Sequence, residues 1–129
     1  MLERERKQLV WIRFIILAGV SAGILWLSLT SSPPVFDDAL LGWDKAQHAL
    51  AYGVLALVAG RFFSLGKLTS SQAWGLAVVY AMGYGGLLEV LQAVAGTGRM
   101  GEWGDLVADA VGALSVGSIG FWLRTRGKP

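Results

Sequence analysis

The stretch AWGLAVVYAMGYGGLLEVLQAV, residues 73–94, decides the fold of this chain. It is apolar almost throughout, and Glu89 is its only charged residue. It has the ~20 residues that a helix rising about 1.5 Å per residue needs to cross roughly 30 Å of hydrocarbon. A helix is also the only open-ended structure that satisfies its own backbone in lipid. The stretch therefore predicts a membrane-spanning helix with an acid near one end.

The composition of the whole chain also indicates a membrane protein. Of its 129 residues, 54% are hydrophobic and only 16% are charged, and the mean hydropathy is +0.54. A soluble domain carries about 25% charged residues. The chain has no cysteine, which excludes a disulfide framework, a thiol nucleophile and a thiolate metal site.

Three further apolar stretches lie at residues 9–29, 46–63 and 106–123. Together with residues 73–94 they predict an all-α fold, a four-helix transmembrane bundle in a single domain, 1–129. The first stretch follows a basic segment, as the apolar part of a secretory signal does. It is longer than the roughly 7 to 15 apolar residues of a signal, and no clear small-x-small cleavage site follows it. We therefore expect a retained anchor helix.

The distribution of charge predicts that both termini lie in the cytoplasm. In that orientation most basic residues are cytoplasmic, namely Arg4, Arg6, Lys7, Arg13, Arg61, Lys67, Arg124, Arg126 and Lys128. Only Lys45 and Arg99 then lie outside. The acids show the complementary bias, since Asp37, Asp38, Asp44, Glu102 and Asp105 all fall on the outer side. Ionisable residues near the outer ends of the stretches therefore lie near the outer leaflet.

Three ionisable side chains, His48, Glu89 and Asp109, lie at one predicted depth on three different stretches. A charged side chain inside hydrocarbon costs roughly 2.5 to 3.5 kcal/mol on insertion scales, so such residues usually face a partner or a wet cavity. Their convergence predicts a functional site. His48 and Glu89 are the candidate catalytic residues, each as a general base.

Helical spacing and one loop add candidate ligand-binding residues around these side chains. They are Asp44, Lys45, Tyr52, Gln92, Arg99, Asp105 and Asp109. Asp44, His48 and Tyr52 repeat at i, i+4 spacing on the second predicted helix, as Asp105 and Asp109 do on the fourth, which puts each set on one face of its helix. Gln92 follows Glu89 by three residues, and Arg99 lies in the next loop, within reach of the cluster. Asp44 and Asp105 could equally serve as first-turn acids of their helices.

Two kinds of ligand fit these residues. The N-termini of two predicted helices, together with Lys45 and Arg99, favour an anionic group such as a lipid phosphate or a carboxylate. The acids could instead hold a divalent cation with His48 as a further ligand, and that cation could bridge to a phosphate. Because the spacing matches no strong metal motif, the sequence leaves the metal content open.

An enzyme and a noncatalytic membrane protein are the two leading hypotheses. The enzyme would be a hydrolase or transferase acting on an envelope lipid or lipid-linked precursor, with water as the nucleophile. The noncatalytic subunit or scaffold would bind an envelope component or another membrane protein, with the cluster as an ion-pair network that locks the bundle. An ion-coupled transporter ranks third, because four short helices need an oligomer to enclose a path. Nucleic acid is not an expected partner, since the basic residues flank membrane spans.

The pattern of polar residues resembles that of the VanZ-like family of membrane proteins. The matching motifs are Asp44-Lys45-x-x-His48-x-x-x-Tyr52, Glu89-x-x-Gln92, Arg99 and Asp105-x-x-x-Asp109-x-x-Gly112, over roughly residues 43–123. The resemblance implies a small multi-pass protein of the bacterial cytoplasmic (inner) membrane. The founding member of the family is associated with resistance to the glycopeptide teicoplanin, which implies a role in the cell envelope.

Small and aromatic residues give two further expectations about packing. Residues with small-xxx-small spacing, such as Ala108 and Gly112, are expected to let the helices approach closely in lipid. Tryptophans near the ends of the stretches are expected to form aromatic belts at the membrane surfaces. These tryptophans are Trp43, Trp74, Trp103 and Trp122.

Overall fold

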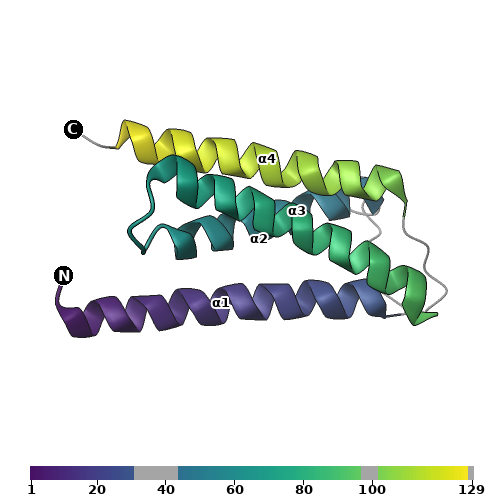
Figure 1. Cartoon of the computed structure of the whole chain (residues 1–129), viewed down its shortest axis with the longest axis horizontal. Coiled ribbons are helices and arrows are strands. Elements are labelled where there is room, and N and C mark those ends of the chain that lie inside the picture. The colour runs from purple at the N-terminus through teal and green to yellow at the C-terminus, as the bar shows by residue number, and fades with distance from the viewer. Residues whose placement is uncertain (31–43, 97–101, 128–129) are drawn as a thin grey trace.

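In the computed structural model, the described residues 1–30, 44–96 and 102–127 fold into four helices. These are α1 (Glu3–Leu29), α2 (Asp44–Phe63), α3 (Ser70–Ala95) and α4 (Trp103–Arg126). The helices lie lengthwise beside one another with alternating direction, and both termini lie at the same end of the bundle (Figure 1). The predicted all-α fold of four helices is confirmed. Trp43 and Arg99 lie outside the described residues.

The helices extend past the predicted apolar stretches, and α3 shows why. It begins at Ser70 rather than at Ala73. Thr69 Oγ1 accepts a hydrogen bond from the Gln72 amide at 3.2 Å, and the Thr69 amide donates to Gln72 Oε1 at 3.0 Å. This capping box satisfies two backbone donors that have no partner within the helix. The helix ends before Gly96, whose φ of 64° is a left-handed conformation that glycine adopts without strain.

Helix α2 lies at the centre of the packing and contacts the other three helices. Its most extensive contact is with α4, where Gly112 lies against the backbone of Ala49. A Cβ atom added at Gly112 would lie 2.0 Å from the Ala49 carbonyl oxygen, so only glycine fits there. This close approach is the kind that the small-residue spacing predicted. Within the described residues, α1 packs on α2 and α3 but does not contact α4.

Polar side chains join α1 to α3. Ser21 Oγ and Tyr80 OH are hydrogen-bonded at 2.8 Å, and Tyr84 OH donates to the Ser21 carbonyl oxygen at 2.5 Å. Nearer the end of the bundle that lies opposite the two termini, Gln92 Nε2 donates a hydrogen bond to the Ser28 carbonyl oxygen at 2.8 Å. Hydrogen bonds of this kind contribute to helix association in lipid, where burial of apolar surface gives little driving force.

Three of the four helices, α1, α3 and α4, are long and apolar enough to cross a membrane. Between 17% and 28% of their most apolar windows is buried within the bundle, so most of this apolar surface faces outward. Large outward apolar surfaces of this kind are rare on soluble proteins and indicate a membrane protein. Helix α2 does not reach the same apolarity, because its first turns carry Asp44, Lys45 and His48 and its last turn carries Arg61.

Trp74 does not lie in an exposed aromatic belt, as the sequence led us to expect. It is 7% exposed, and its ring packs between α2 and α4 against Gly60 and Gly120. Cβ atoms added at these two glycines would lie 2.2 and 2.5 Å from the ring. These two glycines, one on α2 and one on α4, leave the space that the buried indole ring occupies. Trp103 and Trp122 are exposed near the two ends of α4.

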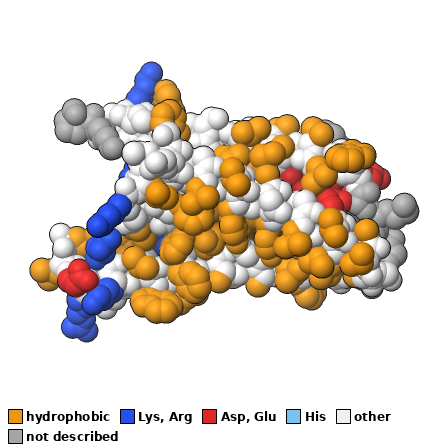
Figure 2. Space-filling view, in the orientation of Figure 1, with side chains coloured by type: hydrophobic (Ala, Val, Ile, Leu, Met, Phe, Trp, Pro, Cys, Tyr) orange, Lys and Arg blue, Asp and Glu red, His pale blue; other side chains and the backbone are white. Residues whose placement is uncertain are grey.

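Charged side chains separate toward the two ends of the bundle (Figure 2). Most lysines and arginines gather at the end that carries both termini, where Glu3 and Glu5 also lie, and the other described acids lie at the opposite end. The predicted functional residues that the structure describes belong to the acidic end.

Candidate functional site

The candidate site lies where α2 and α4 begin, at the end of the bundle opposite the termini. The close approach at Gly112 sets the first turns of these two helices against each other. Lys45 and His48 of α2 therefore face Asp105 and Asp109 of α4. The i, i+4 spacing predicted one polar face on each helix, and in the structure these two faces meet.

His48 and Asp109 form the most enclosed polar pair of the site. The Asp109 side chain is 2% exposed, and His48 Nδ1 donates a hydrogen bond to Asp109 Oδ1 over 2.7 Å. Because an ionised carboxylate only accepts, a hydrogen is on Nδ1, and when the imidazole is neutral Nε2 keeps its lone pair. The buried Tyr52 ring stacks on the imidazole with a centroid separation of 6.2 Å. The orientation of Nε2 is therefore fixed from two sides.

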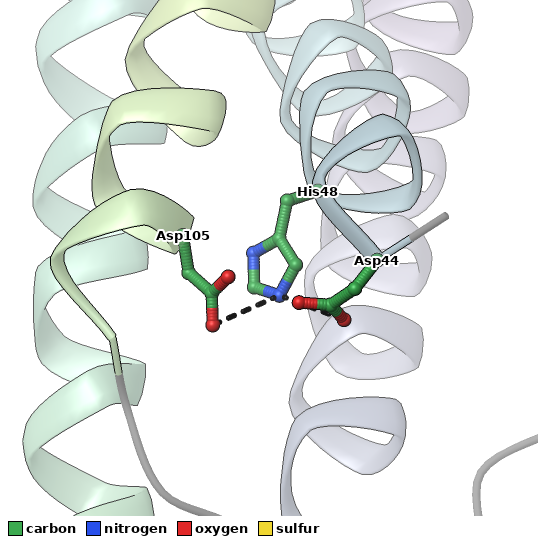
Figure 3. A group of neighbouring side chains, drawn as sticks. All are labelled: Asp44, His48 and Asp105. Carbon is green, nitrogen blue, oxygen red and sulfur yellow. Dashed lines mark ion pairs between the residues drawn. The ribbon is translucent and has the colours of Figure 1, made fainter. Parts of the chain in front are cut away.

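Two carboxylates flank Nε2 of His48 (Figure 3). Asp105 Oδ2 lies 3.7 Å and Asp44 Oδ1 lies 3.9 Å from this nitrogen. The other oxygen of each carboxylate faces Lys45, whose Nζ contacts Asp105 Oδ1 and lies 3.5 Å from Asp44 Oδ2. Lys45 thus holds the two carboxylates with one oxygen of each directed toward Nε2.

Glu89 approaches the same imidazole from α3. Ligand atoms of His48, Glu89 and Asp109 lie within 4.8 Å of one another. Within the part of the chain that the structure describes, the half-buried Glu89 carboxylate makes no hydrogen bond or ion pair. Asp109 Oδ2 also has no donor there, and it packs so closely on Gly85 that an added Cβ would lie 2.6 Å away. A buried acceptor without a donor costs about 1–3 kcal/mol, which a bound cation or donor would offset.

The structure brings together Asp44, Lys45, His48, Tyr52, Glu89, Asp105 and Asp109 of the predicted site residues. Gln92 does not join this group in the structure. Its amide nitrogen donates a hydrogen bond to Ser28 and so links α3 to α1. Arg99 falls outside the described residues. Sequence reasoning missed Glu102, which accepts a hydrogen bond from Lys45 Nζ at 2.9 Å. Glu102 directly precedes the fourth helix, and this position could have indicated that its side chain lies near the site.

The charges of the described site favour a cation as its ligand. The acids Asp44, Glu89, Glu102, Asp105 and Asp109 outnumber the one basic residue beside them, Lys45. Two overlapping groups can hold a metal ion, Asp44 with His48 and Asp105, and His48 with Glu89 and Asp109. Imidazole nitrogen combined with carboxylate oxygen suits Zn²⁺ or Mn²⁺.

The spacing of the first group is close to that of a metal site. Ligands about 2.0 Å from a tetrahedral Zn²⁺ are about 3.3 Å from one another. The two distances from Nε2, 3.7 and 3.9 Å, exceed this value by only a few tenths of an ångström, and all three ligand atoms lie within 4.8 Å of one another. Asp44 is exposed at the start of α2, so its side chain is free to make most of the adjustment.

Comparison of the chain with protein-family models, with curated proteins and with solved structures gave no match. The function proposed below therefore rests on the geometry of the site and on the pattern of residues in the sequence.

Proposed function

We propose that the acidic end of the bundle binds a divalent cation and acts through it on a phosphate-bearing envelope lipid or lipid-linked precursor. The protein does so at the outer face of the bacterial cytoplasmic membrane, with α2 as a fourth span and both termini in the cytoplasm. The gathering of basic residues at the end that carries the termini supports this orientation. The VanZ-like residue pattern supports a role in envelope function or teicoplanin-type resistance.

The arrangement around His48 Nε2 is the observation that carries this proposal. One oxygen from Asp44 and one from Asp105 face the nitrogen, and Asp109 accepts the hydrogen of Nδ1. Histidines that bind metals commonly donate their other ring hydrogen to a carboxylate, which fixes the tautomer and raises the basicity of the ligand. Asp109 supplies that carboxylate from within the bundle.

In this proposal the cation and Glu89 have different chemical roles. A cation held by Asp44, His48 and Asp105 would offset the excess of acids and would supply a Lewis acid for a phosphate oxygen. Glu89 is the carboxylate near the imidazole that has no hydrogen bond within the described residues, so it accepts the proton of the attacking water as general base. Water is the nucleophile because no serine or threonine in the described part of the chain is bonded to His48.

Asp44→Asn is expected to weaken Zn²⁺ binding about tenfold or more, because it removes the charge of one ligand. Asp44 is exposed, so the bundle should fold without its charge. The affinity is measured by competition with a chelating dye, on purified metal-free protein in detergent. Glu102→Gln is the matched control, since Glu102 contacts Lys45 and not the imidazole. Equal losses in the two variants would contradict the site and would indicate a diffuse electrostatic effect.

A noncatalytic subunit or scaffold is the second candidate, and the contacts of Lys45 favour it. Its Nζ joins Asp105 and Glu102 of α4 to Asp44 of its own helix. In this second candidate function the cluster is a structural ion-pair network between α2 and α4. Lys45 would then satisfy Asp44, Glu102 and Asp105, and His48 would satisfy Asp109, so that no cation would be needed.

Lys45→Gln separates the two candidates. The Lys45 side chain is 27% exposed, so losing its ion pairs should lower the melting temperature only modestly. The remaining acids then repel one another, and Zn²⁺ is expected to restore the melting temperature by binding the folded state. Thermal unfolding followed by tryptophan fluorescence, with and without Zn²⁺, measures both effects. A melting temperature that falls and does not respond to Zn²⁺ would favour the structural network.

A further inference from the structure

A groove of about 560 Å³ opens on the outside of the bundle and is lined by three arginines. All four helices contribute to its lining, through Arg13 of α1, Arg61 of α2, Trp74 of α3 and Arg124 of α4. Because α1 does not contact α4 within the described residues, these two helices leave the groove open between them. Apolar side chains, among them Ile119, complete the wall.

Three polar side chains in this groove have buried atoms without a hydrogen-bond partner among the described residues. They are the Ser64 hydroxyl, the Trp74 indole nitrogen and one terminal nitrogen of Arg124. The indole and guanidinium nitrogens can only donate, and the hydroxyl can donate as well. Trp74 is 93% buried by the packing of Gly60 and Gly120, so its orientation is held by the core. Because these three atoms are themselves buried, a ligand in the groove would be held by the remaining donors of the arginines.

The three arginines of the groove also have no carboxylate partner within the described part of the chain. Among the described residues, no acid lies within ion-pair distance of Arg13, Arg61 or Arg124. Arg13 and Arg61 are close enough for their charges to repel. Arg13 and Arg124 each give one hydrogen bond to a carbonyl oxygen at the end of α2, at 2.5 and 3.5 Å, which leaves other donors of each guanidinium for a ligand.

We propose that this groove binds an anionic phospholipid, with the headgroup phosphate at the arginines and an acyl chain along the apolar wall. Basic pockets between membrane helices recognise anionic headgroups in this way. The apolar wall distinguishes a lipid from a free phosphate ion, which has nothing to place there. The site lies at the opposite end of the bundle from the acidic cluster and is independent of the function proposed for it.

Native mass spectrometry of the full chain in neutral detergent tests the proposal, with dioctanoyl phosphatidylglycerol and dioctanoyl phosphatidylcholine as probes. The phosphatidylglycerol should bind in a one-to-one complex and the phosphatidylcholine should bind more weakly. Arg61→Gln should lower the phosphatidylglycerol affinity about fivefold, the usual contribution of one basic residue. Arg126→Gln is the matched control, because Arg126 stacks over Trp122 and does not line the groove.

Ile119→Trp tests the apolar part of the site while all three arginines remain. Ile119 is 56% exposed, so the larger side chain should fill the groove and lower lipid affinity without unfolding the bundle. Equal binding of the two lipids would overturn the proposal. Displacement of the lipid by an equal concentration of inorganic phosphate, or an equal loss in Arg61→Gln and Arg126→Gln, would overturn it too. Arg61 is exposed and makes no hydrogen bond through its side chain to a described residue, so its variant should fold.

Discussion

Gly112→Ala is expected to lower the free energy of unfolding by about 3 kcal/mol or more and to dismantle the acidic site. The added Cβ would lie 2.0 Å from the carbonyl oxygen of Ala49 and 2.7 Å from its carbonyl carbon. These are backbone atoms of α2, which cannot turn aside as the end of a side chain can. The two helices must therefore separate, which carries Asp105 and Asp109 away from His48.

Gly75→Ala is the matched control for this change. An added Cβ at Gly75 meets nothing within 4 Å, and the position is exposed on α3. Removing a glycine from a helix interior should leave stability unchanged or raise it by roughly 0.5–1 kcal/mol. Unfolding in detergent, followed by tryptophan fluorescence, compares the two variants, and dye competition measures Zn²⁺ binding. If Gly112→Ala were as stable as Gly75→Ala, the close approach of α2 and α4 would be wrong.

Hydrophobic length and helical spacing predicted the helices and most of the acidic cluster. Apolar runs located all four helices, because a helix that faces lipid must be apolar over most of its length. The i, i+4 spacing of Asp44 with His48, and of Asp105 with Asp109, put these residues on single faces. In a small bundle, two buried polar faces find few polar partners other than each other, so they are expected to pack together.

The pairings within and beyond that cluster could not be predicted in the same way. Many glycines have small-xxx-small spacing, and the sequence does not show that Gly60 and Gly120 accommodate the ring of Trp74. Gln92 follows Glu89 on the same helix, yet its amide bonds to Ser28 on α1. Such contacts depend on how each helix is rotated about its axis, and hydrophobicity alone leaves that rotation poorly determined when the whole helix is apolar.

The central position of α2 accounts for the lower apolarity of this helix. It contacts all three other helices, so the polar side chains of its first turns can face protein partners instead of lipid. One end carries His48 toward the acids of α4, and the other carries Arg61 into the groove between α1 and α4. Polar side chains within the membrane have the lowest free-energy cost on a helix in this central position.

His48→Asn is expected to weaken Zn²⁺ binding by more than about 100-fold, because it removes the only nitrogen ligand of the site. Asp109→Asn keeps the imidazole but removes the charge that orients it, and changes of that kind typically weaken binding about 10–100-fold. Glu89→Gln should retain Zn²⁺ and lose turnover of the lipid, because Glu89 is the proposed general base. Dye competition and a lipid hydrolysis assay give the two measurements.

The unfolding free energies of variants at His48 and Asp109 distinguish a metal site from a structural ion-pair network. His48→Asn leaves the buried carboxylate of Asp109 without its donor, which should cost about 1–3 kcal/mol. The double variant with Asp109→Asn removes that buried charge, so part of the stability should return while Zn²⁺ binding stays lost. If wild-type protein binds no Zn²⁺ and the two stability losses are coupled, the pair is structural. If Zn²⁺ raises the melting temperature of the wild type but not of the double variant, the ion binds at His48 and its neighbours.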